Sequence, residues 1–105
     1  MAKHDMFLAM ILQNARRAEA RGVMLTVDRA ETRIDLLLLD GSCQPLSAPP
    51  AEIMLKIIES LERGQRDFSS NVFTASIEIV HVQRGVDNTV AHIERWDMGQ
   101  TDDDD

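Results

Sequence analysis

The stretch RIDLLLLDG at positions 33–41 restricts the fold of this chain more than any other segment. Its four consecutive leucines end at Asp40-Gly41, a pair that is a strong turn signal. Because side chains alternate between the two faces of a strand, a strand in this segment is apolar on both sides. Helices can cover one of these sides, and the other side needs loops, a second copy or a partner protein.

Two segments have the periodicity of amphipathic helices. Residues 4–20 carry apolar side chains at spacings of three and four, and Gly22 follows as a stop signal. Residues 51–64 repeat the pattern around Ile53, Ile57 and Leu61 and end at Gly64. Ser47 is a candidate cap for this second helix.

Four segments have the composition and alternation of strands, namely residues 23–28, 32–39, 74–82 and 89–96. We expect the first two to form a hairpin and the last two to flank a turn at RGVDN. Residues 41–50, which hold all three prolines, and residues 65–72 are expected to be loops.

The predicted order of elements is therefore α-β-β-α-β-β. This order indicates an α+β fold, a two-layer α/β sandwich with both helices on one face of a four-stranded, mostly antiparallel sheet. Residues 1–98 are expected to form a single domain, and residues 99–105 an acidic disordered tail.

Regular alternation assigns each strand residue to one face of the sheet. The set facing the helices is Val23, Leu25, Val27, Ile34, Leu36, Leu38, Ala75, Ile77, Ile79, Ala91 and Ile93. The far face is mixed, with Thr26, Arg33, Asp35, Glu78, His92 and Glu94 beside Met24, Leu37, Leu39, Val80, Val82 and Trp96. The apolar members gather toward the leucine end, where we expect a contact surface unless the two long loops cover it.

Composition narrows the choice of partners. Apolar residues make up 44% of the chain, which is enough for a core. The formal net charge is −7, and Asp102–Asp105 account for four of these charges. The sequence contains no basic stripe, so nucleic acid and anionic membranes are poor candidates. It also lacks a signal peptide and any apolar run long enough to span a bilayer, and we expect a cytoplasmic protein.

Few residues offer chemistry. Cys43 is the single cysteine, so an internal disulfide and a cysteine-based zinc site are both excluded. Regular alternation puts His81 and His92 on opposite faces, so we expect no shared metal site there. Asp35, Glu78, His92 and Glu94 share the far face and form a candidate metal-binding or acid-base group. The ordinary alternative is a solvated face with cross-strand pairs, such as Arg33 with Glu78 or Glu94.

Five stretches together resemble a known family: VMLTVD (23–28), DLLLLDG (35–41), IMLKIIESLERG (53–64), TASIEIVHVQRG (74–85) and TVAHIERW (89–96). They are similar to the domain that precedes the motor in type II secretion and type IV pilus assembly ATPases. That family has a helix, a strand ending in an acidic residue, a strand ending in a D-G turn, a helix and two strands. The resemblance covers about residues 5–97.

The departures from the family pattern limit what the resemblance implies. Leu36 and Leu38 stand where the family has two arginines that help to hold nucleotide, and Thr26 stands where it has histidine. The motif G-x-x-x-x-G-K-[ST] is absent, and with it the nucleotide-binding motor. The resemblance therefore implies a motor-less docking or assembly module near a secretion or pilus system, without ATPase activity.

We accordingly predict a non-enzymatic, cofactor-free protein-interaction module that associates through the far face of the sheet. Its partner would be a second copy or a secretion or pilus component. The predicted contact residues are Leu37, Leu39, Val80, Trp96 and Met24. The alternative is a small ligand- or metal-binding protein, or an enzyme, that uses the His/carboxylate group on the same face.

Overall fold

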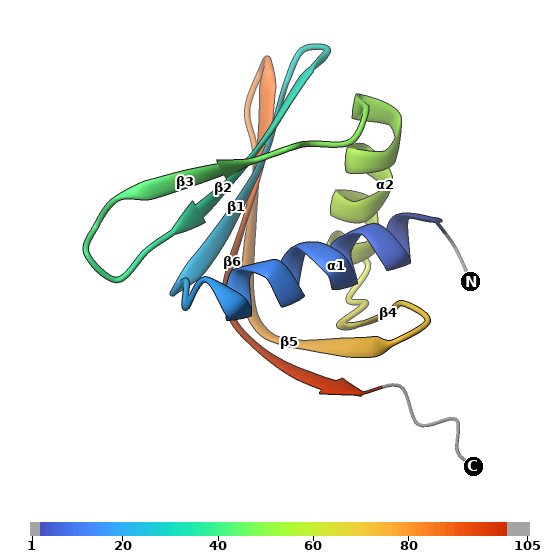
Figure 1. Ribbon diagram of the computed structural model, residues 1–105. Helices are drawn as coiled ribbons and strands as arrows, with labels where there is room; N and C mark the ends of the chain where they lie inside the picture. Colours follow the sequence, from blue (N-terminus) through green and yellow to red (C-terminus); the bar gives the residue numbers. More distant parts are fainter. Residues whose placement is uncertain (1–2, 101–105) are drawn as a thin grey trace.

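The computed structural model describes residues 3–100, which form two helices and six strands. The elements are α1 (Lys3–Arg17), β1 (Gly22–Asp28), β2 (Glu31–Leu37), β3 (Cys43–Leu46), α2 (Ala51–Glu62), β4 (Asp67–Ser69), β5 (Phe73–Arg84) and β6 (Asn88–Gln100). The strands make one antiparallel sheet in the order β3-β2-β1-β6-β5-β4. Both helices lie on the same side of this sheet (Figure 1). The α+β class is confirmed.

The predicted number of four strands is wrong, because both segments expected to be loops contribute a short edge strand. In the proline-rich segment 41–50, β3 pairs with β2, and Leu46 packs against the core. In segment 65–72, β4 pairs with β5 and buries Phe68 completely. One apolar side chain in each segment thus provides the burial that holds a polar stretch in the sheet.

The helices begin and end where local chemistry permits. α1 has Asp5 in its first turn and Arg16 and Arg17 in its last, an arrangement that suits the helix dipole. α2 begins after Pro50, which occupies the N-cap without a side-chain hydrogen bond, so the prediction of Ser47 as the cap is wrong. Gly64 follows α2 with a φ of +99°, a backbone conformation that glycine adopts without strain.

The turn at the end of the leucine run is stabilised by its own side chains. Gly41 has a φ of +90°, and its N–H donates to the carbonyl of Leu38. The Ser42 hydroxyl and backbone N–H donate to Oδ1 of Asp40 at 2.6 and 2.9 Å. These hydrogen bonds, the hydroxyl's above all, lower the pKa of the Asp40 carboxyl from its usual value. The D-G turn predicted from the sequence is present.

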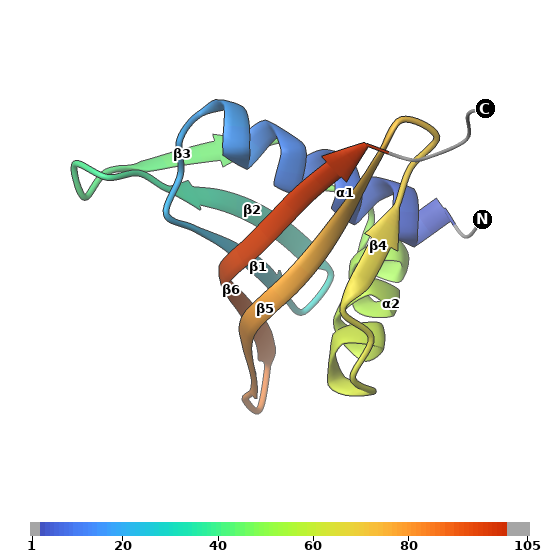
Figure 2. The ribbon, with the colours of Figure 1, turned by 90° about the horizontal axis from the view of Figure 1, so that it is seen from below.

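A pair of β-bulges interrupts the long β5–β6 hairpin. Between the pairs Ile77–Trp96 and Val80–Ile93, only Ile79 and Arg95 are partners, which leaves one unpaired residue on each strand, Glu78 and Glu94. Bulges bend strands and increase their twist. Figure 2 shows β5 and β6 as one curved hairpin with β4 along the outer side of β5.

Because each strand gains one residue, side-chain alternation shifts by one position on both strands. Ile79, predicted to face the helices, is 37% exposed and lies outside the core cluster. Val80 and Val82, predicted for the far face, pack against the core instead. Trp96, also predicted for the far face, is only 4% exposed and belongs to the core. These four errors of face have one cause, since regular alternation holds only up to a bulge.

Trp96 joins the C-terminal strand to the first helix. Its indole N–H donates to the carbonyl of Leu12 at 3.2 Å. The guanidinium of Arg16 lies 5.2 Å from the ring centroid and donates to the carbonyl of Trp96. Figure 1 shows the end of β6 passing beneath α1. α1 is therefore fixed to the sheet by polar contacts as well as by apolar burial.

The core fills the space between the helices and the sheet as one cluster of buried side chains. It includes Val23, Leu25, Val27, Ile34, Leu36, Ala75, Ile77, Ala91 and Ile93, all assigned to this face by sequence alternation. Leu38, beyond the end of β2, packs against the cluster while remaining partly exposed. Across residues 3–100, neither helix is long and apolar enough to cross a membrane.

β6 continues to Gln100, two residues past the predicted end of the domain at residue 98. Of the predicted acidic tail, residues 101–105 lie outside the described part of the chain.

Candidate functional site

The face of the sheet opposite the helices, here called the open face, is the candidate functional surface. Neither helix covers it, and the two segments that could have folded over it form β3 and β4 at the sheet edges instead (Figure 1). The register sets its side chains in rows across β2, β1, β6 and β5. Its members are Met24, Thr26, Arg33, Asp35, Leu37, Ile79, His81, Gln83, Val90, His92 and Glu94.

The apolar side chains of the open face are spread along the strands. Leu37 and Ile79 lie toward the leucine end of β2, Met24 lies in the middle, and Val90 lies toward the hairpin tips. Met24, Leu37 and Val90 are half-buried without a covering layer, and Ile79 is exposed.

The side chains of His92 and Leu37 lie close to the backbone of Gly22. If Gly22 carried a Cβ atom, that atom would lie 3.1 Å from Nε2 of His92 and 3.3 Å from Cδ1 of Leu37. The imidazole of His92 and the side chain of Leu37 therefore fill the space that a side chain at position 22 would occupy, and no hollow remains over Gly22.

The five predicted contact residues do not form one patch. Met24 and Leu37 belong to the open face, as the sequence indicates. Leu39 is 73% exposed, but it lies beyond the end of β2. Val80 and Trp96 face the helices, so their predicted place on this face is wrong. Ile79 and Val90 also belong to the open face but were not predicted as contact residues. Their position depends on the bulges and on the pairing of β6 with β1, and neither produces a pattern in the local sequence.

His81 and His92 are directly opposite each other in the β5–β6 register and share the open face, so their predicted separation is wrong. The bulges bring them to one side. Nε2 of His81 lies 2.6 Å from Oε2 of Glu94, and both side chains are largely solvated at 67% and 43% exposure. An ion pair at this exposure contributes about 0–1 kcal/mol to stability.

The four residues of the alternative metal site are not brought together. Asp35 and His92 are each paired with Met24, which stands between them. Glu94 pairs with His81, and Glu78 lies beside Asp97. Within residues 3–100, no three His, Cys, Asp or Glu side chains are grouped so that they could hold a metal ion.

Glu78 and Asp97 are a like-charged pair next to the bulge. A hydrogen bond with Asp97 raises the pKa of Glu78 from its usual value, and the charge of Asp97 raises it further. Arg95 opposes the shift more weakly. The folded chain therefore disfavours the ionised form of Glu78 relative to the unfolded chain, so ionisation of this carboxyl is destabilising.

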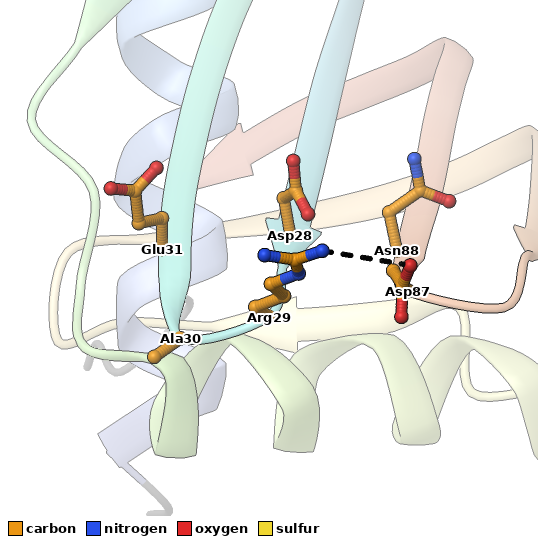
Figure 3. A pocket seen from close by; sticks show the side chains of 6 residues that line it. All are labelled: Asp28, Arg29, Ala30, Glu31, Asp87 and Asn88. Atoms are coloured by element: carbon orange, nitrogen blue, oxygen red, sulfur yellow. Dashed lines mark ion pairs between the residues drawn. The ribbon is translucent and has the colours of Figure 1, made fainter.

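An open recess lies at the end of the sheet where two hairpin tips meet (Figure 3). The recess has a volume of about 740 Å³ and is lined by Asp28, Arg29, Ala30, Glu31, Asp87 and Asn88. The N–H of Arg29, which has a φ of +59°, donates to the carbonyl of Asp87 at 3.0 Å. Their side chains form a solvated ion pair at 3.9 Å, drawn as the dashed line in Figure 3. The two tips are thereby joined.

A second recess of about 260 Å³ shares Asp28, Glu31 and Asn88 with the first and adds Thr26 and Arg33 of the open face. The hairpin tips are thus continuous with the open face. Both turns, at residues 28–31 and 84–88, were predicted correctly from the sequence. Nothing in the sequence indicated that the two turns lie next to each other. Their meeting depends on the pairing of β1 with β6, which puts Asn88 opposite Asp28.

The two edge strands, β3 and β4, are poorly suited to strand addition, whereas the part of β5 beyond β4 has no neighbouring strand within the described residues. The N–H of Leu38 donates to the carbonyl of Ser42, and bonded pairs alternate along an antiparallel ladder. The backbone N–H and C=O groups of positions 43 and 45 therefore point away from β2, toward the outer side of β3. Proline has no N–H, so position 45 cannot donate a hydrogen bond to an added strand. β4 at the other edge has only three residues.

At the β5 edge, a bidentate ion pair joins Arg84 to Glu62 at the end of α2, with distances of 2.8 and 2.6 Å. The hydrogen bond from Arg84 lowers the pKa of Glu62 from its usual value. This contact keeps α2 beside the tip half of β5, which has no neighbouring strand on that side.

Comparison with known protein families, curated proteins and solved structures found no match to this chain.

Proposed function

We propose that this chain is a non-catalytic protein-interaction module that docks a protein partner on its open face. The observation that carries the proposal is that no element within residues 3–100 covers half-buried Met24, Leu37 and Val90. Apolar side chains that a protein leaves uncovered among polar ones are a feature of protein contact surfaces. A cytoplasmic location and the absence of a cofactor are part of the same proposal.

The order of elements supports a relationship to the pre-motor domain of secretion and pilus ATPases. The helix, the β1–β2 hairpin ending in a D-G turn, the second helix and the two long strands follow in the implied order. Leu36 is 1% exposed and Leu38 packs against the core, at the positions where that family has nucleotide-binding arginines. These two positions serve packing here, which favours a scaffold that docks proteins over one that binds nucleotide.

Site-directed photo-cross-linking tests this function in the cells that produce the chain. A benzophenone amino acid replaces Met24 or Leu37, and the control carries it at Lys56, on the exposed side of α2. We expect irradiation to attach a protein to the two open-face positions and not to the control. The proposal is wrong if neither open-face position yields a protein adduct, or if Lys56 yields the same adducts equally well.

A further inference from the structure

We propose that the occupant of the open face is a second copy of this chain, related by a two-fold axis running along the strands between β1 and β6. This inference rests on the proposed function, because it names the partner at the same surface. A two-fold contact requires a patch that is complementary to itself. With this axis, β2 of one copy lies over β5 of the other, and β1 lies over β6.

The first row has a carboxylate at one end and an imidazole at the other. It runs Asp35, Met24, His92, His81 across the four strands. The axis places Asp35 over His81 of the second copy, a carboxylate over an imidazole. Met24 lies over His92 of the second copy, so that the thioether meets an aromatic ring.

The second row shows complementary apolar groups. Toward the leucine end, Leu37 is paired with Gly22. On the other half of the sheet, Ile79 precedes Val80 on β5, beside the unpaired Glu94 of β6. The axis places Leu37 over Ile79 of the second copy and, by symmetry, Ile79 over Leu37. Burial of these side chains would remove apolar surface that is in contact with water in the single chain.

The third row, Arg33, Thr26, Val90, Gln83, completes the match. Arg33 lies over Gln83 of the second copy, and the Thr26 methyl group lies over Val90. None of the pairs in these three rows joins charges of the same sign. Two sheets that pack in this way lie about 10 Å apart with their strands within about 30° of each other.

The alternative axis perpendicular to the strands gives a poorer match. Through the Asp35–His81 row, it would set Leu37 of one copy over Arg33 of the other. It would also leave Asp35 facing another Asp35, with two like charges in contact. The axis along the strands is therefore the arrangement that the rows support.

Sedimentation velocity from about 1 to 500 μM tests whether the dimer forms. We expect a concentration-dependent monomer–dimer equilibrium for the wild type. Leu37→Asp should raise the dissociation constant at least about tenfold, because a carboxylate would enter an apolar contact. The control Val86→Asp changes the fully exposed valine of the β5–β6 turn and should leave the dissociation constant unchanged.

A charge exchange tests the position of the axis. Asp35→Lys or His81→Asp alone should weaken the dimer, and the double variant should recover at least half of the lost association free energy. Positions 35 and 81 lie three strand spacings apart within one chain, about 14 Å, so recovery must come from contact between copies. Circular dichroism checks that all three variants fold.

The outcomes separate this inference from the proposed function. A wild type that stays monomeric at 500 μM overturns the dimer, and so does a double variant no better than the single ones. Cross-links from Met24 to a different protein would then leave the interaction module intact. Cross-linked products with twice the mass of the chain support both.

Discussion

The side chains of Leu36 to Leu39 lie in four environments. Leu36 is 1% exposed in the core, and Leu37 is half-buried on the open face. Leu38 packs against the core beyond the end of β2, and Leu39 is 73% exposed in the turn. Only two of the four leucines therefore contribute to the interior, and substitutions along the run should differ sharply in their effect.

Alanine substitutions at the two ends of the run test this contrast. Leu36→Ala should lower the free energy of unfolding by about 2–5 kcal/mol, because it leaves a cavity in a packed core. Leu39→Ala should change it by less than about 0.5 kcal/mol. Urea unfolding followed by circular dichroism gives both values. Equal losses at the two positions would contradict the burial described here.

The carboxyl of Glu78 makes the stability of the fold depend on pH. Its pKa is raised in the folded chain, so its contribution to stability is present below the unfolded pKa and is lost as pH rises through the folded value. Glu78→Gln should therefore raise the melting temperature at pH 7 and have little effect below about pH 4.

Thermal unfolding of wild type and variant at both pH values measures this difference. Glu52→Gln, which removes the same charge from the first turn of α2, is the control and should not stabilise the protein. A variant that melts at the wild-type temperature at pH 7 would show that Asp97 does not disturb Glu78.

At the scale of the element, local signals specify the helices and the long strands, because their periodicity and turn residues lie within each segment. β1 and α2 follow directly from VMLTVD and from AEIMLKIIESLERG. β3 and β4 do not, since each is too short to show alternation and is held by a distant partner strand. Their single buried or half-buried side chains, Leu46 and Phe68, are the only signals available.

The open face was predictable only in part for the same reason. Alternation assigns Met24 and Leu37 correctly, since β1 and β2 pair without irregularity. It fails for Val80 and Trp96, which lie on either side of the paired bulges. Glutamates at bulge positions carry no pattern that distinguishes them from ordinary exposed strand residues, so the shift in alternation is a property of the pairing.

Pro45 carries a prediction about the β3 edge. Pro45→Val should give this edge an outward N–H and a residue that favours strands, so the edge becomes a template for another strand. We expect higher-order association at concentrations where the wild type shows none, measured by light scattering. Gln44→Val adds the same side chain to a residue whose backbone already bonds to β2, and it should associate less. Identical behaviour of the two variants would contradict the blocking role of Pro45.

At the scale of the whole molecule, contacts between distant parts of the chain hold the fold together. Trp96 joins β6 to α1 across 84 positions, and Arg29 joins one hairpin tip to the other. A chain built on such contacts and on one core is expected to unfold in a single cooperative step.

The single tryptophan makes this cooperativity measurable. Trp96 is 4% exposed, so its emission should shift to longer wavelength when α1 and β6 separate. We expect the urea transition from tryptophan emission to coincide with the transition from far-ultraviolet circular dichroism. An earlier emission change would mean that α1 detaches from the sheet before the sheet itself unfolds.

The extra residues Glu78 and Glu94 act only as a pair. Losing one of them would leave the two strands out of step, and the segment beyond it would turn Trp96 or Val80 toward water. Insertions and deletions in this hairpin should therefore arise together in evolution. When homologous chains are aligned, a one-residue gap in β5 should be matched by a one-residue gap in β6.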